Sequence, residues 1–154
     1  MERFIELDAE DKLLEDAVNK AFEMLYTNDK YLLVNDVSER AITHKFGTYL
    51  QILLGNKEEL CKYDVDCEYN KNIDELKKTP NFQNGTYPDI IIHKRGSNDS
   101  NLIIMEFKKK TENNIEKDIQ KIKDFIDLAG DYKYKYGFFV KLLDEYPDVK
   151  RITR

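Results

Sequence analysis

The sequence predicts an α/β protein in which helices flank a central mixed sheet. Its length of 154 residues suits one ordinary domain, so we expect a single domain over residues 1–154. Segments with apolar side chains at helical spacing alternate with short apolar segments and with one segment of two-residue alternation. In chain order these segments predict helix, helix, strand, strand, strand, helix, strand.

Two amphipathic helices are expected before the sheet. Residues 9–26 carry apolar side chains that form one stripe on a helix, which adds an extra helix at the N-terminal side of the fold. Residues 38–54 predict a second amphipathic helix, for which Ser38 is a suitable N-cap and Gly55 a suitable end.

Three strands follow in the prediction. Residues 62–69 alternate apolar and charged side chains, the pattern of a half-buried strand. Residues 88–94 and 102–108 are strongly apolar and flank a turn-forming polar segment, so we expect them to pair as a hairpin. The polar stretch before this hairpin predicts a long loop with one helical turn near residues 73–78.

The predicted fold ends with one helix and one strand. Residues 115–129 place apolar side chains at helical spacing and end at Gly130, and residues 134–143 form a final apolar strand. No internal repeat or low-complexity linker divides the sequence, which agrees with one domain.

The predicted hairpin brings ionisable side chains together at one end. If its turn is centred near Asn98, Asp89 faces Phe107 and therefore lies beside Glu106. Because side chains alternate along a strand, Glu106 and Lys108 share one face of the hairpin. Two carboxylates and one ammonium group are thus expected at the end of an otherwise apolar hairpin.

Carboxylates gathered in this way predict a metal site. Crowded like charges repel one another, and a cation offsets that cost. Oxygen ligands on rigid strands suit hard ions, so we expect Asp89 and Glu106 to hold Mg²⁺ or Mn²⁺. Glu39 is a further candidate ligand, because it begins the apolar stripe through which the helix at residues 38–54 should pack on the sheet.

These residues form a known motif. Pro88-Asp89, sixteen further residues and then Glu106-Phe107-Lys108 resemble the PD-(D/E)xK motif of a nuclease superfamily. The predicted order of elements also resembles the restriction-endonuclease-like αβββαβ core of that superfamily, here with an extra N-terminal helix.

The resemblance implies catalytic roles within a core of about residues 38–143. In such enzymes the Asp and the Glu hold a divalent metal and the Lys orients or activates the attacking water, roles that fall here on Asp89, Glu106 and Lys108. A Glu on the preceding helix often assists, as Glu39 would. Hydrolysis of a phosphodiester needs charge neutralisation and an activated water, which bound Mg²⁺ can supply.

Each candidate also has an ordinary structural explanation. Asp89 can cap a turn at the start of a strand, and Glu106 and Lys108 can form a salt bridge at a strand end. Glu39 can simply lie favourably at the positive end of its helix dipole. An acidic side chain on an apolar face needs a partner once it is buried, which favours the functional interpretation of Glu106.

Contacts to nucleic acid by other residues are weaker predictions. Lys109 and Lys110 continue a basic run at the end of the hairpin, which either follows a phosphate backbone or forms a solvated edge. Gln120 or Lys121, on the helix after that run, would lie near phosphate. Glu68 ends the first strand, and we expect it to hold no metal.

Charge and hydropathy limit the partners. The net charge is −5, which is unusual for a protein that grips nucleic acid, but residues 108–154 contain 12 Lys and Arg against 9 Asp and Glu. No apolar stretch approaches membrane-spanning length and no secretory signal is recognisable, so we expect no membrane contact and a cytoplasmic location.

We therefore expect a Mg²⁺-dependent nuclease that hydrolyses DNA. The main alternative is a catalytically inactive nuclease-fold protein that acts as a nucleic-acid- or protein-binding subunit, and a further alternative is a metal-dependent hydrolase that acts on RNA or nucleotides. A homodimer would bring two sites to two strands, and a partner protein would supply the specificity that a small acidic domain lacks.

Overall fold

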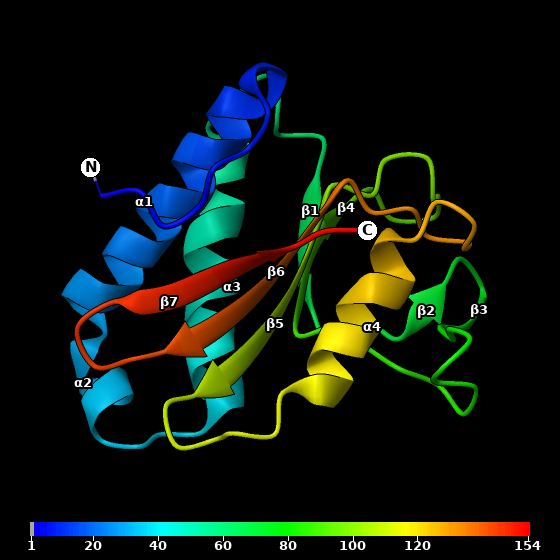
Figure 1. The fold of residues 1–154 in the computed structure, drawn as a ribbon. Helices are drawn as coiled ribbons and strands as arrows, with labels where there is room; N and C mark the ends of the chain where they lie inside the picture. The colour runs from blue at the N-terminus through cyan, green and yellow to red at the C-terminus, as the bar shows by residue number, and fades with distance from the viewer. Residues whose placement is uncertain (1) are drawn as a thin grey trace.

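The computed structural model describes residues 2–154 and contains a five-stranded mixed sheet with helices on both faces (Figure 1). The strands of this sheet are β1 (Asp64–Cys67), β4 (Ile90–His93), β5 (Ile103–Lys109), β6 (Tyr136–Leu142) and β7 (Pro147–Ile152). They lie in the order β1-β4-β5-β6-β7, and β5 and β6 run parallel while the other neighbours are antiparallel. The prediction of an α/β protein with a central mixed sheet flanked by helices is confirmed.

Three long helices cover the sheet. α1 (Lys12–Asn28) and α3 (Glu39–Gly55) pack on one face, and α4 (Glu116–Ile126) packs on the other (Figure 1). α3 begins where Ser38 Oγ accepts a hydrogen bond from the backbone N–H of Ala41 at 3.3 Å, so the predicted N-cap is confirmed. Across residues 2–154, none of the helices combines the length and the apolar character that crossing a membrane requires.

Several short elements were not predicted from the sequence. They are the 3₁₀ turn η1 (Ala9–Asp11), the helix α2 (Lys30–Val34) and the small hairpin of β2 (Lys71–Asn72) and β3 (Glu75–Leu76). The helical turn predicted near residues 73–78 is wrong, because the chain there forms the β2–β3 hairpin. The turn of this hairpin holds Ile73 at φ 57°, a left-handed conformation that β-branched residues rarely adopt.

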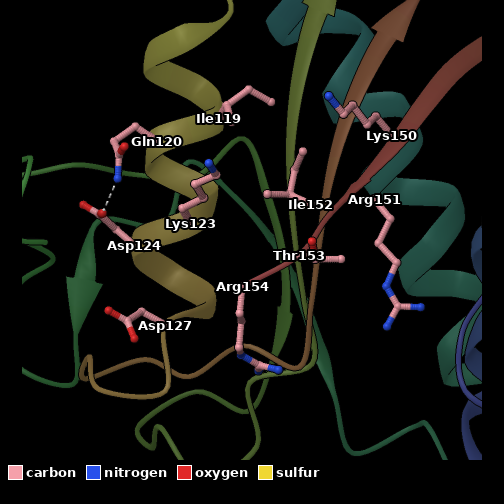
Figure 2. Close-up of a pocket in the computed structure, with 10 residues that line it drawn as sticks. All are labelled: Ile119, Gln120, Lys123, Asp124, Asp127, Lys150, Arg151, Ile152, Thr153 and Arg154. Atoms are coloured by element: carbon pink, nitrogen blue, oxygen red, sulfur yellow. Dashed lines mark hydrogen bonds between the residues drawn. The ribbon is translucent and has the colours of Figure 1, made fainter.

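The strand β7 was also not predicted. It pairs with β6 on one side and forms an edge of the sheet on the other. A proline at its start and several charged residues are typical of an edge strand, and they obscure the apolar pattern. The end of β7 and the helix α4 border an open cavity of about 560 Å³ (Figure 2).

The β4–β5 hairpin sets the position of the predicted site. Ile90 pairs with Met105, which carries Asp89 to the level of Glu106. The register was predicted to within about one residue, with Asp89 opposite Phe107, and the observed register differs from it by one residue, because the turn is centred slightly earlier along the chain than expected. The two carboxylates remain on neighbouring strands at the same end of the hairpin.

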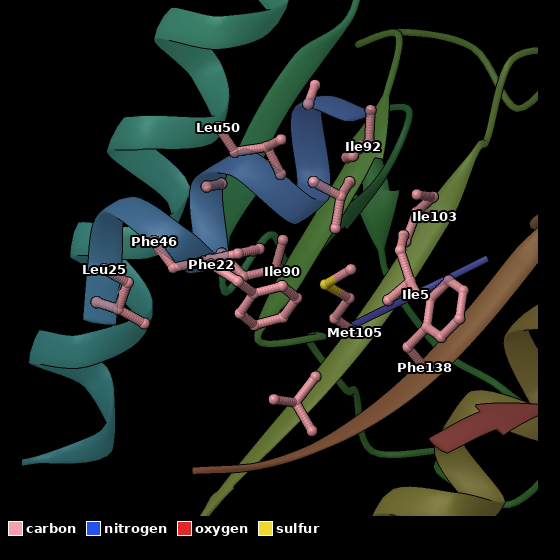
Figure 3. Close-up of a cluster of buried hydrophobic side chains, with 14 of the residues drawn as sticks. Ile5, Phe22, Leu25, Phe46, Leu50, Ile90, Ile92, Ile103, Met105 and Phe138 are labelled. Atoms are coloured by element: carbon pink, nitrogen blue, oxygen red, sulfur yellow. The ribbon is translucent and has the colours of Figure 1, made fainter. Parts of the chain in front are cut away.

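Two apolar layers hold the helices against the sheet. Buried side chains between the sheet and the helices α1 and α3 include Phe22, Phe46 and Met105 (Figure 3). A smaller cluster joins the opposite face to α4, where Gly137 on β6 is needed because a Cβ atom would collide with Ile122. The helix α4 is thus held closely over β6, next to the end of the hairpin.

Candidate active site

Asp89 and Glu106 meet at the end of the β4–β5 hairpin. The backbone N–H of Asp89 donates to Glu106 Oε1 at 3.3 Å, and the backbone N–H of Phe107 donates to Asp89 Oδ2 at 2.8 Å. These hydrogen bonds tie each carboxylate to the neighbouring strand. The structure therefore brings together the two acidic residues that the sequence predicts to hold a metal.

Burial raises the pKa of both carboxyl groups. Glu106 is 1% exposed, and burial raises its pKa well above the usual value; the charge of Asp89 raises it further, whereas Lys121 lowers it. Asp89 is half-buried, and burial raises its pKa as well, against the hydrogen bond from Phe107 and the charge of Lys121. Burial thus makes the ionised form of both carboxylates costly, a cost that a bound cation would offset.

Two lysines form ion pairs between β5 and α4 beside the carboxylates. Lys108 Nζ lies 3.3 Å from Asp118 Oδ2, and Lys121 Nζ lies 3.1 Å from Glu106 Oε2. Asp118 and Lys121 lie one turn apart on α4, so both reach the same side of the helix. Burial opposes the charge on Lys108, but Asp118 raises the pKa of its ammonium group. Each of two β5 side chains is therefore matched by an oppositely charged α4 side chain.

Glu39 lies at the start of α3 and faces the same site. Together with Asp89 it lines a cavity of about 360 Å³. Burial and the charge of Asp89 raise the pKa of Glu39, whereas Lys108 and the backbone of Lys109 lower it. The third predicted carboxylate is thus brought to the opening beside Asp89. The residues that line this cavity are Ser38, Glu39, Arg40, Thr43, Glu68 and Asp89.

Glu68 lines the same cavity, although it was expected to hold no metal. Its carboxylate is engaged by Arg40, whose Nη2 lies 3.0 Å from Glu68 Oε1. Because this carboxylate already has a cationic partner, we assign it no metal, and that expectation stays a prediction.

The two lysines that follow Lys108 are paired with acidic residues at the surface. Lys109 Nζ lies 2.8 Å from Asp36 Oδ1, and Lys110 Nζ lies 2.6 Å from Asp144 Oδ1. Exposed ion pairs of this kind exchange readily with solvent and ions. Contact of Lys109 and Lys110 with nucleic acid therefore stays a prediction.

Of the two candidates on α4, the structure brings only Lys121 to the carboxylates. Gln120 Nε2 instead donates to Asp124 Oδ1 at 2.9 Å, along the border of the cavity that Figure 2 shows. Successive residues of a helix point in directions about 100° apart, so Gln120 lies on a different side of α4 from Lys121, and its contact with phosphate stays a prediction.

Asp118 completes the site and was not among the candidate residues. It is 8% exposed and lies in the first turn of α4, on the buried side of that helix. The available signal was an acidic residue four positions before the buried Ile122, on an otherwise apolar stripe. A buried acid of this kind needs a cation, which Lys108 provides.

The donor set is suited to a hard divalent ion. Within residues 2–154, no three His, Cys, Asp or Glu side chains are gathered closely enough to form a metal-binding group. Mg²⁺, however, usually keeps several water ligands and binds one or two carboxylates. Asp89 and Glu106 supply two such carboxylates, and a cation between them would offset the burial and mutual repulsion that raise their pKa values, so the residues present fit this ion.

Comparisons with other proteins identify no family for this chain. No protein-family model, no curated protein and no solved structure matches the chain.

Proposed function

We propose that this protein is a Mg²⁺-dependent nuclease of the PD-(D/E)xK superfamily, with the restriction-endonuclease-like fold, that hydrolyses phosphodiester bonds of DNA. The observation that carries the proposal is the adjacent pair of carboxylates, Asp89 and Glu106, with two ammonium groups close by. The succession α3, β1, β4, β5, α4, β6 agrees with an αβββαβ core. The extra N-terminal helix expected from the sequence corresponds to α1.

Each residue of the site has a role in the proposed reaction. Asp89 and Glu106 would hold the metal, with Glu39 as a further oxygen donor at the opening. Bound Mg²⁺ supplies charge neutralisation on the phosphoryl oxygens and a more acidic water. Lys108 orients the attacking water and stabilises the negative charge that develops on the phosphate. Asp118 is a positioning residue, because its carboxylate holds the Lys108 ammonium group.

A cleavage assay with a matched control tests the proposal. Plasmid, linear and branched DNA are each incubated with Mg²⁺, with Mn²⁺ and with EDTA, at a temperature where all variants are folded. Asp89→Asn should abolish cleavage, whereas Asp66→Asn, which changes a carboxylate on β1 that contacts His93 and Arg95 at the other end of β4, should cleave as the wild type does. Wild-type protein that cuts none of the three DNAs, or cleavage unchanged in Asp89→Asn, contradicts the proposal.

A second candidate is a catalytically inactive protein of the same fold that binds nucleic acid or another protein. It is favoured by the net charge of −5 and by the lack of a three-donor metal group within residues 2–154. Calorimetric titration with Mn²⁺ separates the two candidates. A nuclease binds the ion and loses that binding in Glu106→Gln, whereas the inactive protein takes up no ion there. Sedimentation velocity then tests the expected homodimer.

A further inference from the structure

A row of lysines continues from the proposed site across the α4 face of the sheet. Lys108 on β5 and Lys141 on β6 are register partners on adjacent parallel strands. They point to the same face as Ile104 and Phe139, which are buried beneath α4. Lys141 therefore extends the positive charge of Lys108 to the next strand.

The row reaches the cavity between α4 and β7 (Figure 2). Lys150 on β7 points to the same face as Ile152, which is buried with the α4 cluster. Lys123, on α4, lies on the opposite border of this cavity of about 560 Å³. Lys123 and Lys150 are exposed. Within residues 2–154, none of Lys123, Lys141 and Lys150 forms an ion pair.

The arginines of the same cavity already have partners. Arg154 Nε donates to the carbonyl oxygen of Ile126 at 2.6 Å, which satisfies the C-terminal end of α4. The guanidinium group of Arg151 lies 4.9 Å from the ring centre of Tyr136 and 3.7 Å from a carboxylate oxygen of Asp8. The lysines are thus the cations of this cavity that remain available to a ligand.

The acidic groups nearby are partly engaged as well. Asp124 accepts a hydrogen bond from Asn81 Nδ2 at 2.7 Å, and Asp127 accepts one from the backbone N–H of Ala129 at 2.9 Å. Asp148 is the register partner of Lys141 and forms no ion pair with it within the described residues. One carboxylate therefore lies beside the row of lysines without forming an ion pair with Lys141.

We infer that Lys141, Lys150 and Lys123 bind successive phosphates of the DNA strand that leads away from the proposed cleavage site. This inference rests on the proposed function and adds the path of the substrate to it. Neighbouring strands lie about 4.8 Å apart, so two strand spacings carry the row about 10 Å from Lys108. If the row runs along the axis of the duplex, one DNA strand advances about 3.4 Å per nucleotide, so that distance spans about three nucleotides. Ammonium groups along such a path release the counterions of the backbone, which drives binding.

Binding in EDTA tests this inference independently of cleavage. The affinity for a fluorescein-labelled DNA duplex is measured by anisotropy at several salt concentrations. The double variant Lys123→Ala/Lys150→Ala should bind about tenfold more weakly at low salt, and its slope of log K against log salt should fall by about 1.8, or about 0.9 for each lost phosphate contact. The control Lys45→Ala/Lys57→Ala removes two exposed lysines at α3 and the turn after it, and should bind as the wild type does.

Several outcomes would overturn the inference. Equal binding by the two double variants excludes the row as a binding surface, and so does wild-type affinity that is independent of salt. Binding of an RNA duplex of equal length without binding of the DNA duplex overturns the assignment to DNA. If the cleavage assay fails while Lys123→Ala/Lys150→Ala still loses DNA binding, the nuclease proposal is wrong and the phosphate path remains supported.

Discussion

The two ends of strand β4 hold acidic side chains in opposite electrostatic states. Before its start, Asp89 lies beside Glu106, and burial raises the pKa of both groups. At its end, His93 Nε2 lies 2.7 Å from Asp66 Oδ2, and Arg95 Nε donates to the same oxygen at 2.9 Å. Burial opposes the charge of Asp66, but His93 and Arg95 hold its pKa well below the usual value.

The difference separates structural charge from charge that is open to a ligand. The negative charge of Asp66 is offset within the protein by a ring nitrogen and a guanidinium group. Within the described residues, Lys121 forms an ion pair with Glu106, whereas Asp89 forms none. Unbalanced charge lowers stability, so a fold retains it where a cation or a charged substrate is to be bound. This argument supports the proposed site at the Asp89 end, which we call the functional end below, and indicates a structural role for the Asp66 end, which we call the structural end.

The structural end also contains a buried cation. Lys77 is 2% exposed, and its ammonium group lies 5.1 Å, 5.5 Å and 5.3 Å from the ring centres of Tyr69, Phe125 and Tyr132. Burial lowers the pKa of Lys77 to about 8, against the attraction of Asp66. These rings attract the ammonium group through their π faces and join the segment after β3 to the α4 side of the molecule.

The largest expected effect belongs to the functional end. Lys108→Met removes the ammonium group beside Asp118, and we expect it to lower the rate of DNA cleavage by about 10²–10³-fold, the usual value of one electrostatic contact to a reacting group. The change leaves the buried Asp118 without its cation, so rates are compared at a temperature at which both proteins are folded. Initial rates at saturating DNA measure the effect, with Lys45→Met as control. A rate equal to the control would mean that Lys108 acts at a distance from the phosphate.

The next effect concerns stability at the structural end. Asp66→Asn weakens hydrogen bonds to His93 and Arg95, and should lower the free energy of unfolding at neutral pH by about 2 kcal/mol, as measured by urea denaturation. Because the folded pKa is lowered, this stabilisation is present above the unfolded value of about 3.9 and is lost as the pH falls below it. The wild type should therefore lose more stability on acidification than the variant. Equal losses would remove the contrast between the two ends.

A divalent ion should stabilise the folded protein by binding at the Asp89 end of β4 and not at the Asp66 end. At tenfold excess over its dissociation constant, Mg²⁺ should raise the free energy of unfolding by about 1.4 kcal/mol, because it binds the folded protein. Glu106→Gln should lose this effect, whereas Asp66→Asn should keep it, with thermal unfolding as the measurement. Stabilisation that survives in Glu106→Gln would place the ion elsewhere.

Local patterns could predict the hairpin and the helix before it. Apolar strands around a polar turn fix their own pairing, so Asp89 and Glu106 were placed together with an error of one residue. The N-cap at Ser38 was equally readable, because a cap depends on neighbouring residues alone. These predictions needed no knowledge of how distant elements pack.

The partners of these residues depended on packing and could not be predicted. Helical spacing identifies the apolar stripe of α4, but its exact rotation decides that Lys121 contacts Glu106 and that Asp118 contacts Lys108. The edge strand β7 was missed for a related reason. Its stability comes from backbone pairing with β6, which leaves little trace in the side-chain pattern of a charged edge.

The smallest expected effect tests whether the attraction of the surrounding rings and of Asp66 offsets the cost of burying the Lys77 ammonium group. Lys77→Met retains an unbranched side chain of similar length, and should raise stability at neutral pH by about 1 kcal/mol, because apolar replacement of a buried charge is commonly neutral or stabilising. The folded pKa of about 8 lies below the unfolded value of about 10.4, so the unfolded chain holds the proton more strongly and wild-type stability should rise between these pH values. The variant should lack that rise in urea denaturation. A variant less stable than the wild type would mean that the attraction of the three rings outweighs the cost of burial, and that both ends of the hairpin depend on a cation.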